Sequence, residues 1–121
     1  MKRVLLVDDH EDTLLVLRSL FSDAYDVVMC KNGRAAVDLL SKSHFDLVLT
    51  DIVMPEIEGI ELILYSKKTF PNMKIIAVTG QMNVGGQDYL EAATAFGVDA
   101  CFRKPFSLVD LLAKVNNLLK E

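Results

Sequence analysis

The stretch LVLTDIVMPEIEG, residues Leu47–Gly59, decides the fold of this chain. Three apolar residues and a threonine lead into a carboxylate, Asp51, and a turn containing proline follows. Unbroken apolarity over strand length is typical of a strand covered on both faces of a parallel sheet. An ionised group at the end of such a strand is costly unless something compensates its charge. The stretch therefore predicts a buried strand that delivers Asp51 to a prepared environment.

The same alternation of strand and helix recurs along the chain. Four further apolar runs have strand length, namely Val4–Val7, Val27–Cys30, Ile75–Val78 and Ala100–Phe102. Segments with the spacing of amphipathic helices lie between the predicted strands and at the end of the chain. The residues of their predicted buried faces are Leu14, Leu17 and Phe21; Ala36, Val37 and Leu40; Ile60, Ile63 and Leu64; Leu90 and Ala93; and Leu108, Leu111, Leu112, Val115, Leu118 and Leu119. Ser107 and Asp110 have capping-box spacing at the start of the last helix. This (βα)5 order predicts an α/β domain with a mostly parallel sheet and helices on both faces.

Composition limits the classes of function. The chain has 121 residues, 51% of them hydrophobic, with a mean hydropathy of +0.29 and a net charge of -4. These values predict one globular domain and argue against nucleic-acid binding and against an anionic membrane surface. The first apolar run is too short for a signal peptide or a membrane span, so a cytoplasmic location is expected. Cys30 and Cys101 lie in apolar stretches and are interpreted as reduced core residues.

Polar residues follow four of the five predicted strands. Asp8 and Asp9 follow the first strand, Asp51 the third, Thr79 the fourth and Lys104 the fifth. In an open parallel sheet these positions share one edge, where ligands bind. Three carboxylates in one cleft favour a divalent cation such as Mg²⁺, and the lysine and the hydroxyl suit an anion beside it. Taken singly, the aspartates are also typical helix caps or turn residues, the threonine of a strand end and the lysine of a solvated loop.

Four motifs in this order resemble the receiver domains of two-component response regulators. They are VLLVDD at Val4–Asp9, DIVMPEIEG at Asp51–Gly59, VTG at Val78–Gly80 and KPF at Lys104–Phe106. The resemblance covers the whole chain and implies that residues 1–121 form one receiver domain. It also implies a flavodoxin-like (βα)5 three-layer sandwich whose five-stranded parallel sheet has the order 2-1-3-4-5.

The resemblance assigns roles to individual residues. Asp51 would accept a phosphoryl group from the phosphohistidine of a histidine kinase. The cofactor would be Mg²⁺, or Mn²⁺, held by Asp8, Asp9, Asp51 and the backbone carbonyl of Val53. Contacts with the phosphoryl group would come from Thr79 and Lys104. Secondary roles fall on Gly80, which leaves room above the site, on Cys101, and on Pro105, whose bond to Lys104 is expected to be cis.

Three features depart from the pattern or remain open. Cys101 stands where receivers usually carry an aromatic residue that swings inward on activation, so that ring switch is expected to be absent or weakened. Phe102, one position later, faces the opposite side of its strand and is interpreted as a core residue. His10 could be a metal ligand or a phosphohistidine, but it is interpreted as a polar loop residue at a helix start. The loop containing Gly85 and Gly86 is expected to be longer than usual, either as part of the switch or as a tolerated insertion.

The expected function is a signalling switch. Its partners would be a sensor histidine kinase or phosphotransfer protein and a downstream protein partner or effector domain, and a phosphorylation-dependent dimer is allowed. The chain would not be an enzyme beyond its own phosphoryl transfer and autodephosphorylation. The alternative is a phosphohydrolase that uses Asp51 as nucleophile on external substrates, but Val53 occupies the position where such enzymes carry a second aspartate. A flavodoxin-like FMN carrier is disfavoured because no Ser/Thr-rich phosphate loop follows Val7.

Overall fold

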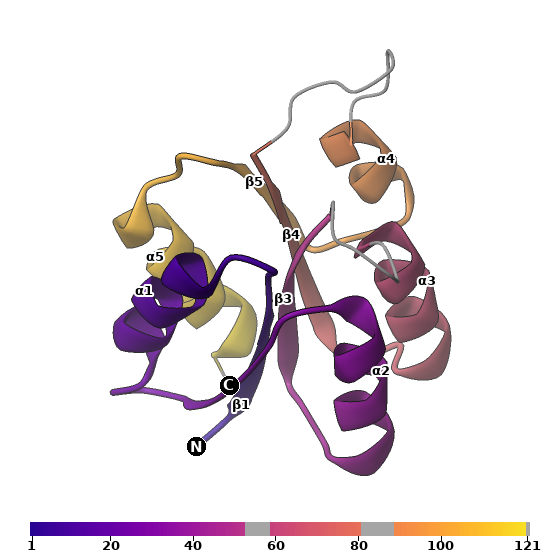
Figure 1. Ribbon diagram of the computed structural model, residues 1–121, viewed down its shortest axis with the longest axis horizontal. Coiled ribbons are helices and arrows are strands. Elements are labelled where there is room, and N and C mark those ends of the chain that lie inside the picture. The colour runs from indigo at the N-terminus through magenta and orange to yellow at the C-terminus, as the bar shows by residue number, and fades with distance from the viewer. Residues whose placement is uncertain (53–58, 81–88, 121) are drawn as a thin grey trace.

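Five strands and five helices alternate along the chain (Figure 1). The computed structural model describes residues 1–52, 59–80 and 89–120, so Val53 and the loop with Gly85 and Gly86 lie outside the described residues. The strands are β1 (Arg3–Val7), β2 (Asp26–Cys30), β3 (Leu47–Asp51), β4 (Lys74–Thr79) and β5 (Ala100–Arg103). The helices are α1 (Glu11–Phe21), α2 (Gly33–Lys42), α3 (Gly59–Thr69), α4 (Tyr89–Ala95) and α5 (Leu108–Leu119).

The sheet is parallel and has the order β2-β1-β3-β4-β5, which confirms the predicted topology. Figure 1 shows α1 and α5 on one face of the sheet and α2, α3 and α4 on the other. The result is the three-layer flavodoxin-like sandwich. Its strand register brings the carboxyl ends of β1, β3, β4 and β5 to one edge.

Two hydrophobic cores fill the spaces between the sheet and its helices. The larger core lies under α2, α3 and α4 and takes Leu5, Val48 and Ile75 from the strands. The other lies under α1 and α5 and takes Leu6, Leu49 and Ile76. Neighbouring residues of one strand thus serve opposite cores, which is why the central strands are apolar without alternation.

The predicted helical faces are largely right, with two corrections. Leu64 in α3 is 45% exposed and Leu108 in α5 is 39% exposed, although both were assigned to buried faces. Periodicity identifies the buried side of a helix, but it does not fix how far that side extends around it. The predicted cap of α5 is confirmed, because the Ser107 side chain accepts a hydrogen bond from the Asp110 N–H.

Two aspartates tie strand starts together at the edge away from the predicted site. The Asp46 carboxylate accepts a hydrogen bond from the Arg3 N–H at 2.8 Å, while its own N–H donates to the Arg3 carbonyl. Asp99 repeats this double link with Ile75, again at 2.8 Å through its carboxylate. We call Asp46 and Asp99 the strand-entry aspartates. They satisfy an N–H in the first two residues of a neighbouring strand, Arg3 in β1 and Ile75 in β4, and thereby help to specify register.

None of the helices in the described part of the chain combines the length and apolarity needed to cross a bilayer.

Candidate functional site

The strand ends bring four of the predicted site residues into one small space. Asp8 directly follows β1 and is fully buried, Asp51 ends β3 with 4% of its surface exposed, and Thr79 ends β4 with 1% exposed. Lys104 follows β5, and its N–H donates to the Thr79 carbonyl at 2.8 Å. Buried carboxylates are costly unless a cation or hydrogen-bond donor lies beside them.

Lys104 supplies a cation to two of these carboxylates. Its Nζ lies 2.8 Å from Asp8 Oδ2 and 3.3 Å from Asp51 Oδ2. Burial lowers the pKa of Lys104, but the hydrogen bond to Asp8 and the charges of Asp51 and Asp8 outweigh it, so the pKa lies above its ordinary value. Lys104 is therefore an ammonium at neutral pH. The alternative in which it is a solvated loop cation is wrong.

The backbone around Asp51 is held by β4 and by the start of α3. Asp51 is in register with Val78, and the Ile52 N–H donates to the Val78 carbonyl at 2.9 Å. The Gly59 N–H donates a hydrogen bond to the Ile52 carbonyl at 2.7 Å. A Cβ at Gly59 would lie only 2.2 Å from the Asp51 carbonyl oxygen, so a side chain there would displace the backbone of one or the other. Glycine is required at this close approach.

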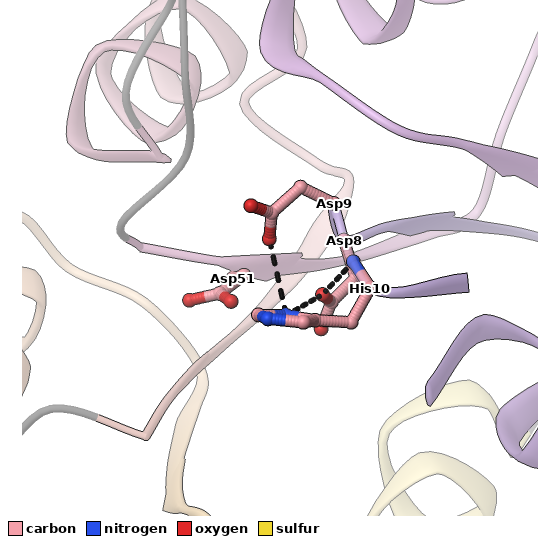
Figure 2. Close-up of side chains that lie close together, drawn as sticks. All are labelled: Asp8, Asp9, His10 and Asp51. Carbon is pink, nitrogen blue, oxygen red and sulfur yellow. Dashed lines mark hydrogen bonds and ion pairs between the residues drawn. The ribbon is translucent and has the colours of Figure 1, made fainter. Parts of the chain in front are cut away.

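An acidic cluster surrounds the Asp51 carboxylate. Asp8, Asp9, His10 and Asp51 each offer one ligand atom, and these atoms all lie within 4.8 Å of one another. Figure 2 shows the Asp51 carboxylate beside the side chains of Asp8, Asp9 and His10. Oxygen donors of this kind are the ligands that Mg²⁺ and Mn²⁺ prefer, and the ammonium of Lys104 already occupies part of the space as a substitute cation. The donor set fits a divalent metal ion.

His10 lies closer to this cluster than the sequence interpretation allowed. It does occupy the N-cap position of α1, but its side chain makes no capping hydrogen bond. Its Nδ1 lies 3.2 Å from Asp8 Oδ1 and 3.2 Å from Asp9 Oδ1 (Figure 2). His10 is thus a polar residue at the helix start, as predicted, and its ring in addition lies beside two carboxylates. A signal was available in the sequence, because histidine is a poor N-cap residue and Ser, Thr, Asp or Asn is preferred there.

Two of the three residues with secondary roles, Gly80 and Pro105, lie next to Lys104. The atoms nearest to a Cβ built on Gly80 belong to the Lys104 side chain, the closest at 3.7 Å. The Lys104–Pro105 peptide bond is cis, which is the isomer that the resemblance implies.

Cys101 and Phe102 point to opposite sides of β5. Cys101 packs against the core under α2, α3 and α4, whereas Phe102 packs against the core under α1 and α5. The Phe102 ring also meets Phe106 edge-on, with centroids 6.0 Å apart. Phe102 is thus a core residue, as predicted. On the other face, Cys101 Sγ lies 3.4 Å from Thr94 Oγ1 of α4, so a thiol stands where receivers usually carry a ring.

The fold and the site together define an α/β protein with an acidic, lysine-containing pocket at the carboxyl ends of its strands. The family model for the response regulator receiver domain matches residues 4–116. The chain belongs to this family. It is a receiver domain, and receiver domains serve as phosphoacceptors in two-component signal transduction.

Curated relatives agree with this assignment. The chain is 36% identical over 120 residues to the response regulator receiver protein CpdR of Brucella abortus, and the match covers 98% of both proteins. It is 33% identical to the response regulator MprA of Mycolicibacterium vanbaalenii and 31% identical to the response regulator SaeR of Staphylococcus aureus. The chain spans about half the length of these two relatives, 50% and 51%.

Solved structures show the same architecture. A CheY-like response regulator receiver domain protein from Methanospirillum hungatei superposes with a TM-score of 0.88 at 30% identity, covering 97% of this chain and 92% of that one. The signal receiver domain of an HD domain-containing protein from Pseudomonas fluorescens gives a TM-score of 0.90 at 25% identity, with coverage of 98% and 94%.

Proposed function

We propose that residues 1–121 act as one receiver domain in which Asp51 accepts a phosphoryl group from a phosphohistidine. The observation that carries this proposal is the placement of the nearly buried Asp51 carboxylate within 3.3 Å of the Lys104 ammonium and beside Asp8. In the transfer, an Asp51 carboxylate oxygen forms a bond to phosphorus while the bond between phosphorus and the imidazole nitrogen breaks. The imidazole leaves with the electron pair of that bond.

The residues around Asp51 have distinct tasks in this reaction. Lys104 pairs with an oxygen of the phosphoryl group, which requires that its ammonium move from Asp8 toward the new anion. The Thr79 hydroxyl, at the end of β4, donates a hydrogen bond to the same group. Both contacts are made to phosphoryl oxygens on which negative charge develops during the transfer, so they stabilise the transition state.

The metal site of the proposal consists of Asp8, Asp9 and Asp51, with the Val53 carbonyl as a further ligand. When bound, Mg²⁺ or Mn²⁺ would supply positive charge that offsets the repulsion between a carboxylate and an anionic phosphoryl group. Asp9 is 33% exposed and is suited to direct coordination, whereas the buried Asp8 already bonds to Lys104 and is suited to contact through water. The chain itself would catalyse only its own phosphorylation and autodephosphorylation.

A phosphodonor protein would approach over α1 and the start of α5. An apolar hollow of about 320 Å³ lies beside Lys104 and is lined by Val16, Leu17, Phe106 and Leu108. Val16 is 48% exposed, and Val109 on the first turn of α5 is 76% exposed. Exposed apolar side chains next to a reactive group favour docking of a protein surface. We propose that a sensor histidine kinase or phosphotransfer protein binds here, and that the phosphorylated domain then binds a downstream partner or effector domain, or a second copy of itself.

Incubation with Mg²⁺ and a small-molecule phosphodonor tests the proposal. Intact-mass spectrometry should detect one added phosphoryl group on the wild type and none on Asp51→Asn. Asp38→Asn is the matched control, because Asp38 is an exposed α2 residue whose carboxylate pairs with Lys42 of the same helix. This variant should be modified like the wild type. An unmodified wild type, or a modified Asp51→Asn, would overturn the proposal. Steady turnover of an external phosphate monoester would instead favour the phosphohydrolase.

A further inference from the structure

The His10 imidazole has a position that helix capping does not explain. It occupies the N-cap of α1, yet its ring turns away from the helix N–H groups and toward two carboxylates. A Ser, Thr, Asp or Asn at this position would cap α1 better. We propose that His10 is a nitrogen ligand of the divalent cation at this site. The proposal rests on the proposed function, and it implies a preference for transition-metal ions such as Mn²⁺, Co²⁺ and Ni²⁺ over Mg²⁺.

The distances match those between neighbouring ligands of one ion. Adjacent ligands of an octahedral ion with bonds of about 2.1 Å lie about 3 Å apart. His10 Nδ1 is 3.2 Å from Asp8 Oδ1 and 3.2 Å from Asp9 Oδ1. The nitrogen therefore needs only a small movement to share an ion with Asp9 Oδ1 as a direct ligand, while Asp8 contacts the same ion through water. The Asp51 ligand atom lies within the same 4.8 Å limit, which places a third carboxylate in reach.

The exposure of the ring also suits a ligand. The His10 side chain is 68% exposed, so Nε2 can keep its proton in contact with water while Nδ1 presents its lone pair to the ion. The backbone is fixed beneath the ring, because the His10 N–H donates to Asp8 Oδ1 at 2.9 Å. A ligand held on a short, hydrogen-bonded connection is well oriented before the metal arrives.

The chemical consequence is metal selectivity. Mg²⁺ prefers oxygen ligands and gains little from an imidazole, whereas first-row transition ions bind nitrogen well and in the order Mn²⁺, Co²⁺, Ni²⁺. A site of carboxylates alone would discriminate weakly among these ions. With His10 as a fourth donor, affinity should rise most for Ni²⁺ and least for Mg²⁺.

Calorimetric titrations of metal-free protein with Mg²⁺ and with Ni²⁺, at one fixed pH, test the inference. His10→Gln should weaken Ni²⁺ binding about tenfold or more and should change Mg²⁺ binding less than about threefold. His44→Gln is the matched control, because His44 Nε2 also lies 3.1 Å from an aspartate two residues away, Asp46 Oδ1, but at the opposite edge of the sheet. Equal losses in the two variants would overturn the inference and indicate general binding of Ni²⁺ to exposed histidines.

Nuclear magnetic resonance of the wild type provides a second readout that needs no His10 variant. The chain has only two histidines, so the ring nitrogens of each can be assigned with His44→Gln. Addition of Zn²⁺ should change the chemical shift of His10 Nδ1 strongly and leave those of the His44 ring unchanged, and an unchanged His10 Nδ1 shift would overturn the inference.

The two proposals fail differently. Mg²⁺ binding that is lost in Asp51→Asn but independent of His10 would retain the proposed function, whereas a wild type that binds none of these ions would remove its metal site.

Discussion

At the scale of single residues, Lys104 provides the charge that allows two buried carboxylates to share one pocket. Asp8 has no exposed surface and Asp51 has 4%, yet Lys104 Nζ reaches both. Because the three carboxylates of the cluster outnumber this one ammonium, an excess of negative charge remains for a divalent cation. Lys104 thus stabilises the metal-free protein, and under the proposed function it changes partners when Asp51 accepts the phosphoryl group.

Lys104→Met should destabilise the apo protein. The substitution removes the ammonium that contacts both Asp8 and Asp51, and we expect the free energy of unfolding in EDTA to fall by about 1–3 kcal/mol. The raised pKa of Lys104 means that this contribution is present below the ordinary lysine range and is lost only as the pH rises through the folded-state value. Urea unfolding at pH 7 measures the change.

A comparison with Mg²⁺ sharpens this test. Mg²⁺ should stabilise Lys104→Met more than it stabilises the wild type, because in the wild type it competes with an ammonium already in place. Lys42→Met removes an exposed pair with Asp38 and should change the free energy of unfolding by less than about 0.5 kcal/mol. Equal stabilisation of wild type and Lys104→Met by Mg²⁺ would contradict the substitute-cation role.

Gly59→Ala should disturb the backbone on which Asp51 stands. The added Cβ would lie 2.2 Å from the Asp51 carbonyl oxygen and 2.5 Å from Ile52 Cα, and neither backbone atom can yield cheaply. We expect a loss of about 1–3 kcal/mol in the free energy of unfolding and slower phosphorylation by a small phosphodonor. Gly80→Ala is the steric control for stability, because its nearest contact would be 3.7 Å. Similar losses in both variants would refute the close-approach explanation.

At the scale of secondary structure, the strand-entry aspartates fix the register between neighbouring strands. The Asp46 carboxylate accepts the N–H of Arg3, the first residue of β1, and the Asp99 carboxylate accepts the N–H of Ile75, the second residue of β4. Each aspartate donates its own N–H to the carbonyl of the same residue. The Asp46 carboxylate also contacts His44 Nε2, and the Arg3 guanidinium lies over the Phe45 ring with its Cζ 4.6 Å from the ring centroid. Register at the start of the sheet is therefore set by polar groups, while the apolar strand interiors alone would permit slippage.

Asp46→Ala should lower the free energy of unfolding by about 1–2 kcal/mol at pH 7, because the Arg3 N–H loses its acceptor. Asp46→Asn keeps an oxygen acceptor and should lose less. Burial raises the pKa of Asp46, but the hydrogen bonds from the Arg3 N–H and His44 and the charges of His44 and Lys2 outweigh it and hold the pKa below its ordinary value. This contribution is present above about pH 4 and is lost as the pH falls through the folded-state value.

Acid titration of stability measures this difference. The difference in the free energy of unfolding between the wild type and Asp46→Ala should decrease as the pH falls below about 4. A gap that stays constant down to pH 2 would show that the carboxylate charge is irrelevant at this position.

At the scale of the whole molecule, most of the fold was predictable from the sequence. Strands buried on both faces leave a continuous apolar signal, and polar residues at their ends share an edge as a consequence of parallel topology. The positions of Asp51, Thr79 and Lys104 follow from this rule. The rule does not predict where the His10 ring lies, because that depends on the local path of the chain after β1. Nor does it predict the pairing of Asp46 with Arg3, because that depends on a neighbouring strand far away in the sequence.

Hydrogen exchange should divide the sheet into a resistant centre and more labile edges. All five residues of β3 are buried, whereas the four residues of β5 are each half-buried and most of β2 is likewise partly exposed. Amides shared by β1, β3 and β4 should exchange only through global unfolding, and those of β5 should exchange faster. Mass spectrometry of labelled peptides measures these rates. Equal protection of β3 and β5 would contradict this division.

The strand-entry aspartates also bear on how such a domain can diversify. They hold register at one edge of the sheet, while Asp8, Asp51 and Lys104 lie at the other. Loops at the reactive edge can therefore be exchanged between homologous chains without removing the groups that align the strands. A chimera that keeps Asp46 and Asp99 should retain its topology while acquiring the partner specificity of the loop donor.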